Sequence, residues 1–173
     1  LVTQIAAATA GIAWMLVEWF SGEKKPSLLG MCSGAVAGLV AITPASGFVG
    51  PSGAFFIGLA AGTFCYFTCT KLKSALGYDD SLDVFGIHAL GGALGAILTG
   101  VFTLKAIGGT AGLLEGNAAQ VKLQLIGVGV TVAYTAIATY IILKVVNFIT
   151  PLRASDAQER DGLDLSQHGE QVG

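Results

Sequence analysis

The run DVFGIHALGGALGAILTGVF, residues 83–102, decides how this chain folds. It is apolar and rich in glycine, and it contains one histidine, His88. A helix needs about 20 mostly apolar residues to cross the hydrocarbon core of a bilayer. An ionisable group inside such a helix is costly and usually faces the interior of a bundle or a cavity. The run therefore predicts a membrane-spanning helix whose histidine faces the interior of a bundle or a cavity.

The composition of the whole chain agrees with this interpretation. Of the 173 residues, 53% are hydrophobic and 12% are charged, whereas soluble domains carry roughly 25% charged residues. Four further apolar runs lie at 1–20, 28–43, 53–70 and 119–149. We therefore predict an all-α transmembrane bundle of about five spans over residues 1–150, followed by a polar tail over residues 151–173.

The sequence does not favour an enzyme, a metalloprotein or a nucleic-acid-binding protein. No nucleophile with a neighbouring base, phosphate-binding loop or metal-ligand cluster is recognisable, and no stretch is strongly basic. The three cysteines lie in apolar runs, where small thiols serve as packing residues. We therefore expect no cofactor and no metal, and the lipid bilayer as a partner.

Positive charge predicts the orientation of the spans, because cytoplasmic loops carry an excess of Lys and Arg. With five spans, the loops at 21–27 and 71–83 and the tail lie on one side of the membrane. Most of the basic residues belong to that side: Lys24, Lys25, Lys71, Lys73, Lys144, Arg153 and Arg160. Only Lys105 and Lys122 belong to the other side. We therefore predict a cytoplasmic C-terminus.

Glycines recur at intervals that suit close helix packing. Small residues four apart let helix backbones approach closely in lipid, where hydrophobic attraction between helices is absent. The pattern occurs in several spans and predicts a compact bundle. The candidate packing residues are Gly30, Gly34, Gly38, Gly91, Gly92 and Gly95.

His88 is the residue that most needs a role. A neutral imidazole offers one hydrogen-bond donor and one acceptor, which suits the passage of a small polar molecule. The alternative is a core histidine bonded to a backbone carbonyl. Helix spacing puts Val84, Gly91, Gly92, Gly95 and Thr99 on its face. Val84 either forms a narrow dry stretch that excludes hydrated ions, or it is a lipid-facing or packing residue.

Two polar residues near span ends also have alternative roles. Asp83 stands at the predicted start of the fourth span, where a carboxylate caps free N–H groups; the alternative is a role at a pore entrance. Thr43 precedes Pro44 at the end of the second span, so its hydroxyl either lines a lumen or bonds back to its own helix.

Four separated segments resemble the ammonium transporter family of the Amt/Mep type, which is related to the Rhesus proteins. They are GIAWMLVEW (11–19), PSLLGMCSGAVAGLVAITPASGFV (26–49), DVFGIHALGGALGAILTGVF (83–102) and GLDLSQHGE (162–170). The resemblance covers nearly the whole chain and implies the last five helices of an eleven-helix, inverted-repeat transporter that forms homotrimers with one pore per subunit.

The resemblance also implies roles for individual residues. His88 would be one of two pore histidines, with its partner in the first repeat, and Val84, Thr43 and Val36 match pore-lining positions. The tail resembles a cytoplasmic regulatory tail that signals between subunits and, in bacteria, docks PII-type signalling proteins. Its candidate residues are Gly162, Leu163, Asp164, Ser166, His168, Gly169 and Glu170.

We therefore expect ammonium or ammonia transport across the cell membrane. Two other functions remain open at the level of sequence. The chain could belong to an ammonium sensor, or it could be a structural or assembly module without transport of its own, with His88 a satisfied core residue.

Overall fold

The computed structural model describes residues 1–21 and 25–170, and every element in these ranges is helical. Its contacts divide the chain into two compact units, Leu1–Gly129 and Val130–Gly173. The boundary lies inside one long helix, so it differs from the domain boundary after residue 150, which stays a prediction. Lys24, one of the charges used to orient the spans, lies outside the described residues.

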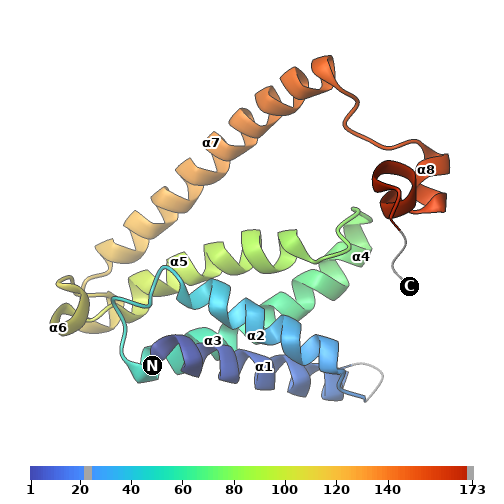
Figure 1. The fold of residues 1–173 in the computed structure, drawn as a ribbon. Helices are drawn as coiled ribbons and strands as arrows, with labels where there is room; N and C mark the ends of the chain where they lie inside the picture. Colours follow the sequence, from blue (N-terminus) through green and yellow to red (C-terminus); the bar gives the residue numbers. More distant parts are fainter. Residues whose placement is uncertain (22–24, 171–173) are drawn as a thin grey trace. The chain divides into compact units, whose positions relative to one another are not determined.

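The first unit contains a bundle of helices that run back and forth (Figure 1). Thr43 and Pro44 lie just beyond the second helix, where a loop was predicted. Gly77 ends the third helix and its extensions, in the left-handed conformation at φ 63°. Its helices are α1 (Val2–Ser21), α2 (Leu28–Ile42), α3 (Pro51–Phe67) with its extensions η1 (Thr68–Leu72) and α4 (Lys73–Leu76), and η2 (Phe85–Leu90) with α5 (Gly91–Phe102).

Short elements connect α5 to the last long helix, and a folded tail follows it. They are α6 (Lys105–Gly108), the 3₁₀ turn η3 (Leu113–Glu115), α7 (Ala119–Ile149), α8 (Asp156–Asp161) and η4 (Asp164–His168). The segments η1, η2 and η4 are π-helical. The fold class predicted from the sequence, an all-α bundle of apolar helices, is confirmed.

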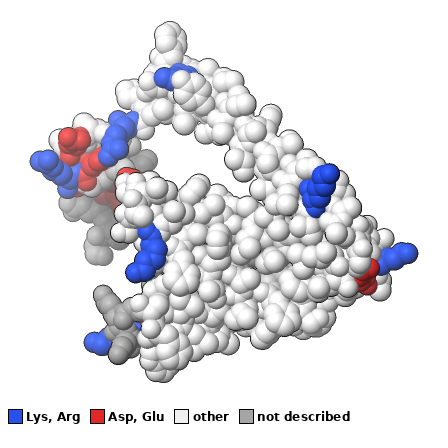
Figure 2. All heavy atoms as spheres, turned by 180° about the vertical axis from the view of Figure 1, so that it is seen from behind, with Lys and Arg blue, Asp and Glu red and all other residues white. Residues whose placement is uncertain are grey.

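Each predicted span coincides with a helix, but the helices differ in length and hydropathy. In the described ranges, three are long and apolar enough to cross a membrane: Pro51–Leu76, Phe85–Phe102 and Ala119–Ile149. The helix Leu28–Ile42 is apolar but shorter. Helix α1 has 20 residues but is outside this group, because Gln4 and Glu18 lower its mean hydropathy. Figure 2 shows a surface on which most of the visible area carries no charged side chain.

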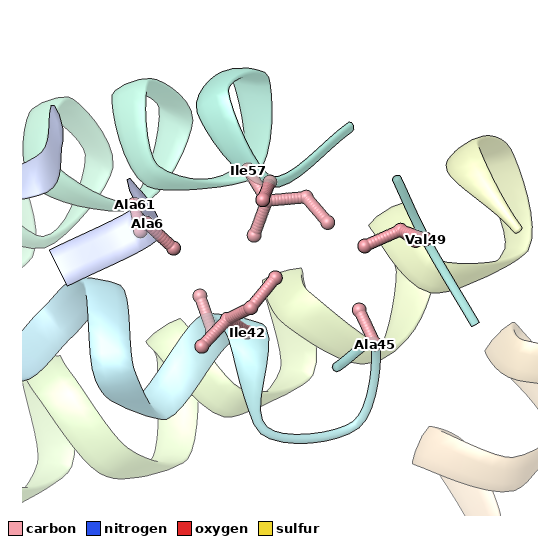
Figure 3. Close-up of a cluster of buried hydrophobic side chains, with 8 residues drawn as sticks. Ala6, Ile42, Ala45, Val49, Ile57 and Ala61 are labelled. Atoms are coloured by element: carbon pink, nitrogen blue, oxygen red, sulfur yellow. The ribbon is translucent and has the colours of Figure 1, made fainter. Parts of the chain in front are cut away.

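The core of the first unit is made of small and aliphatic side chains. One cluster joins α1, α2, α3 and the loop after α2, and Ile42 and Ile57 point into the same space from α2 and α3 (Figure 3). A second cluster contains Trp14, Ala37 and Ile87, so it connects α1 and α2 to η2.

Glycines allow the backbones in this core to touch. A Cβ added at Gly38 would lie 2.3 Å from the carbonyl oxygen of Ala6, and one at Gly62 would lie 2.2 Å from that of Ala10. Helix α1 therefore packs directly against both α2 and α3. A Cβ at Gly95 would lie 2.2 Å from the Ala41 carbonyl oxygen, which shows the same contact between α5 and α2.

Candidate functional site

His88 lies in the π-helical segment η2, which leads directly into α5. It is the fourth residue of the apolar helix Phe85–Phe102, so it lies in the first turn, about 5 Å along the axis at 1.5 Å per residue. Its side chain is exposed, whereas the preceding Ile87 is buried, with 4% of its surface accessible. Within residues 1–21 and 25–170, no hydrogen bond involves the imidazole. The core-histidine alternative therefore has no support in this unit.

Asp80, not Asp83, supplies the carboxylate that caps this helix. The N–H groups of Val84 and Phe85 donate to the two Asp80 carboxylate oxygens at 2.9 and 2.8 Å. The Asp83 carboxylate instead binds the Lys73 ammonium at 2.8 Å. Asp83 lies at φ 55°, a left-handed conformation that few residues other than glycine adopt. The capping role predicted for the Asp83 side chain is therefore corrected: the turn directs its carboxylate to Lys73.

The single face predicted for His88 and the residues after it is divided in the structure. Val84 and His88 are exposed, while Gly91, Gly95 and Thr99 are buried in the bundle. The prediction assumed α-helical spacing throughout. A π turn accommodates one extra residue, which rotates everything beyond it by about 100° relative to an unbroken α-helix. The face containing His88 therefore does not continue along α5 as predicted.

Helix α2 contributes the other candidate pore residues. It runs parallel to α5 (Figure 1), and the Gly92 and Gly95 positions lie beside Val40 and Ala41. One turn back along both helices, Ile87 and Ala37 pack in the same cluster. Their chain neighbours His88 and Val36 are therefore at the same level of the bundle, and both are exposed.

Thr43 lies at the C-terminal end of α2 with its side chain exposed. Its hydroxyl donates to the carbonyl oxygen of Leu39 at 2.7 Å. The back-bonding alternative is therefore realised in this unit. The hydroxyl oxygen keeps its acceptor capacity, so the bond does not prevent a lumen-lining role.

Five of the six candidate packing glycines lie in close contact. A Cβ would come within 3.0 Å of another residue at Gly30, Gly34, Gly38, Gly91 and Gly95. Gly92 differs, since the nearest atom to its Cβ position is Val40 Cγ1 at 3.7 Å, an ordinary distance. Adjacent residues on a helix point about 100° apart, so Gly91 can face the bundle while Gly92 lies at its edge.

The tail residues form a small folded motif in the second unit. Ser155 and Gln158 form a reciprocal capping box at the start of α8. Gly162 at φ 90° and Gly169 at φ 67° flank η4, in left-handed conformations that glycine adopts readily. The Ser166 hydroxyl donates to the Gly162 carbonyl at 2.9 Å. The structure thus explains both glycines of the segment GLDLSQHGE.

Sequence reasoning missed three residues around His88: Asp80, Thr68 and Gly86. Asp80 lies four residues before the first helical N–H that it binds, and the left-handed conformation of Asp83 between them has no clear sequence signal. Thr68 is buried at 5% exposure, and its hydroxyl oxygen lies 3.2 Å from the Gly86 carbonyl oxygen on a different helix. No local pattern predicts a contact between residues 18 positions apart.

The chain is similar to known proteins over almost its whole length. The model of the Ammonium Transporter Family matches residues 1–172. An ammonium transporter of Aquifex aeolicus is 50% identical over 98% of this chain, and one of Bacillus subtilis is 46% identical over 96% of it. The crystal structure of Saccharomyces cerevisiae Mep2 matches 90% of this chain with a TM-score of 0.83 and 38% identity.

These matches cover only part of each relative. The chain spans 40% of the Aquifex protein and 42% of the Bacillus protein, and it covers 36% of the Mep2 chain. The matched region therefore corresponds to less than half of each of these proteins.

Proposed function

Because this chain belongs to the ammonium transporter family, we propose that it forms the C-terminal half of a protein that moves ammonium or ammonia across a membrane. The family is one of transporters, not of enzymes. The observation that carries the proposal is the family match over residues 1–172, in a chain whose helices are long and apolar enough to span a bilayer.

In this proposal, His88 contacts the permeating molecule. The imidazole is exposed on the bundle, level with the exposed Val36, and no hydrogen bond within the described ranges occupies it. A second imidazole from outside this chain would complete a histidine pair, as the resemblance implies. Two adjacent imidazoles in a dry pore do not both carry a proton at low cost, so the pair would accept and release the proton of ammonium.

Val84, Val36 and Thr43 would line the same conduit. The two valines have 50% and 40% of their surface accessible in this chain, as do many other apolar side chains of its helices. Apolar walls beside an imidazole would exclude hydrated ions while admitting a small neutral molecule. Asp83 and Lys73 would hold the loop at the entrance through their ion pair.

The proposal extends to assembly and location. We place the protein in the cell membrane as a homotrimer with a cytoplasmic C-terminus, where the loops rich in lysine also lie. The folded tail, α8 with η4, would carry the contacts to neighbouring subunits or to a PII-type protein.

The test replaces His88 in the full-length protein. Purified wild-type and H88A proteins are reconstituted in vesicles, and uptake of labelled methylammonium is measured against empty vesicles and with potassium as a competitor. We expect H88A to lose most of the selective uptake. Selective uptake equal to that of the wild type would remove His88 from the mechanism.

The alternative of an assembly module without transport has its own test. A thiol introduced by V84C, in a C32A background that removes the exposed native thiol, should react with a small water-soluble reagent if Val84 borders a conduit. An unreactive thiol would favour packing alone.

Deletion of the residues after Arg153 should alter transport while leaving membrane insertion intact, and unchanged uptake and regulation would count against a regulatory tail.

A further inference from the structure

Two π-helical segments from different helices contact each other next to His88. Segment η1 continues α3, and segment η2 precedes α5. The Thr68 hydroxyl oxygen lies 3.2 Å from the Gly86 carbonyl oxygen of η2 and 3.0 Å from the Cys65 carbonyl oxygen of its own helix. Its single proton can be shared between both carbonyls as a three-centre bond. Thr68 is buried, so this bond is shielded from solvent.

Gly86 makes this contact possible. A Cβ at this position would lie 2.5 Å from Cys69 Sγ and 3.2 Å from Thr68 Oγ1. Any side chain would therefore push η2 away from η1 and break the bond between the Thr68 hydroxyl and the Gly86 carbonyl. Gly86 allows the close approach because it has no side chain, and Thr68 stabilises it by donating a hydrogen bond to the Gly86 carbonyl oxygen.

The contact lies two residues before His88 in the chain. The hydroxyl fixes the backbone at Gly86, and the next residue, Ile87, is anchored in the core with Ala37. Because Gly86 is hydrogen-bonded and Ile87 is packed in the core, the direction of the imidazole depends on the extra residue that the π turn accommodates. Conversion of this turn to an α-helix would rotate the residues beyond Gly86 by about 100° relative to those before it.

We propose that Thr68 is a positioning residue for His88: by holding the Gly86 carbonyl, it maintains the π turn that directs the imidazole outward from the bundle. The inference rests on the proposed function, in which the imidazole contacts the permeating molecule. Thr68 does not touch that molecule and acts only through the backbone of η2.

The first experiment determines the backbone geometry of η2 directly and does not depend on transport. Density maps of the full-length protein are compared for the wild type, T68V and T68S. We expect T68V, which keeps the shape but loses the donor, to convert the turn at residues 85–90 to α-helix and to rotate the His88 ring. T68S keeps the hydroxyl and should retain the π turn. Should T68V not assemble, T68A provides the same test with less bulk.

The second experiment measures methylammonium uptake by the same proteins in vesicles. We expect T68V to lose most of the selective uptake, as H88A does, because its imidazole no longer points toward the permeating molecule, and T68S to retain it. T63V is the matched control, because within the described ranges the Thr63 hydroxyl donates only to its own helix, to the Leu59 carbonyl oxygen at 2.9 Å. We expect T63V to leave uptake unchanged. A retained π turn in T68V, or unchanged uptake despite a converted turn, would overturn the role of Thr68.

The two proposals fail in different ways. A wild-type protein without selective uptake would refute the transport function, while the maps would still decide whether Thr68 maintains the turn. A transporting wild type with an unaffected T68V would leave the proposed function standing and refute the positioning role alone.

Discussion

The contact between α3 and α1 should not tolerate a single methyl group at Gly62. A Cβ there would lie 2.2 Å from the Ala10 carbonyl oxygen and 2.9 Å from its Cα, whereas ordinary contacts begin at 3.4 Å. Both neighbours are backbone atoms and cannot rotate away. In G62A the two helices must therefore separate by roughly 1 Å, which weakens dispersion contacts along the whole interface.

The size of the effect follows from two opposing terms. Overpacking a core costs about 1–3 kcal/mol, and a clash with backbone belongs at the upper end. Replacement of glycine by alanine inside a helix stabilises that helix by about 1 kcal/mol, because alanine has the higher helix propensity. The net loss is about 2 kcal/mol, which corresponds to a fall of about 4–8 °C in Tm for a chain of this size.

Thermal unfolding of the purified protein in detergent, followed by tryptophan fluorescence, measures this loss. G127A is the matched control: it adds the same methyl group to helix α7 at a position with no atom within 4 Å in the described chain. We expect G127A to unfold at the wild-type temperature or slightly above it. A G62A protein that unfolds within 1–2 °C of the wild type would refute the direct backbone contact between α1 and α3.

Three further predictions concern the loop before His88. D80N should lower stability by about 1 kcal/mol, because an amide has one acceptor oxygen where the carboxylate has two, so either the Val84 or the Phe85 N–H loses its partner; unchanged Tm would contradict the capping role. D83G should be more stable than D83A by about 1 kcal/mol, because both lose the Lys73 bond but only glycine accepts φ 55° without strain; equal denaturation midpoints would contradict the strained conformation. The Tyr78 hydroxyl is buried without a hydrogen-bond partner in the described residues, and its burial, with the nearby Asp80 charge, raises the pKa of the phenol. Since the unfolded chain ionises first, the wild type should lose stability as pH rises above about 10, and Y78F should lose less; parallel Tm–pH curves would contradict this.

The positions and lengths of the helices could be read largely from the sequence. Long apolar runs have few stable states in a bilayer, because unpaired backbone groups are costly in lipid and a helix satisfies them within one segment. The runs at 53–70, 84–103 and 119–149 accordingly match helices to within a few residues, once η1 is added to α3 and η2 to α5. The glycine intervals likewise indicated where backbones approach, although not which backbones meet.

The site around His88 was only partly accessible to sequence reasoning. The pattern identified the histidine, the resemblance supplied its expected partner, and spacing supplied the neighbours. The assumption of α-helical spacing then failed at η2, so that Gly91 and Gly95 face the bundle while His88 does not. The capping carboxylate was placed at Asp83 instead of Asp80 because a left-handed turn at an aspartate has no clear sequence signal.

The sequence by itself thus determined that this chain is a bundle of apolar helices with a polar tail, since hydropathy and helix length are properties of each segment alone. Tertiary structure decided which glycine meets which carbonyl, where the π turns lie, and that His88 points out from the bundle while Ile87 points in. Those features depend on contacts between helices distant in the chain. A hydroxyl at Thr68 and the missing side chain at Gly86 have their effect only when folding brings the two together.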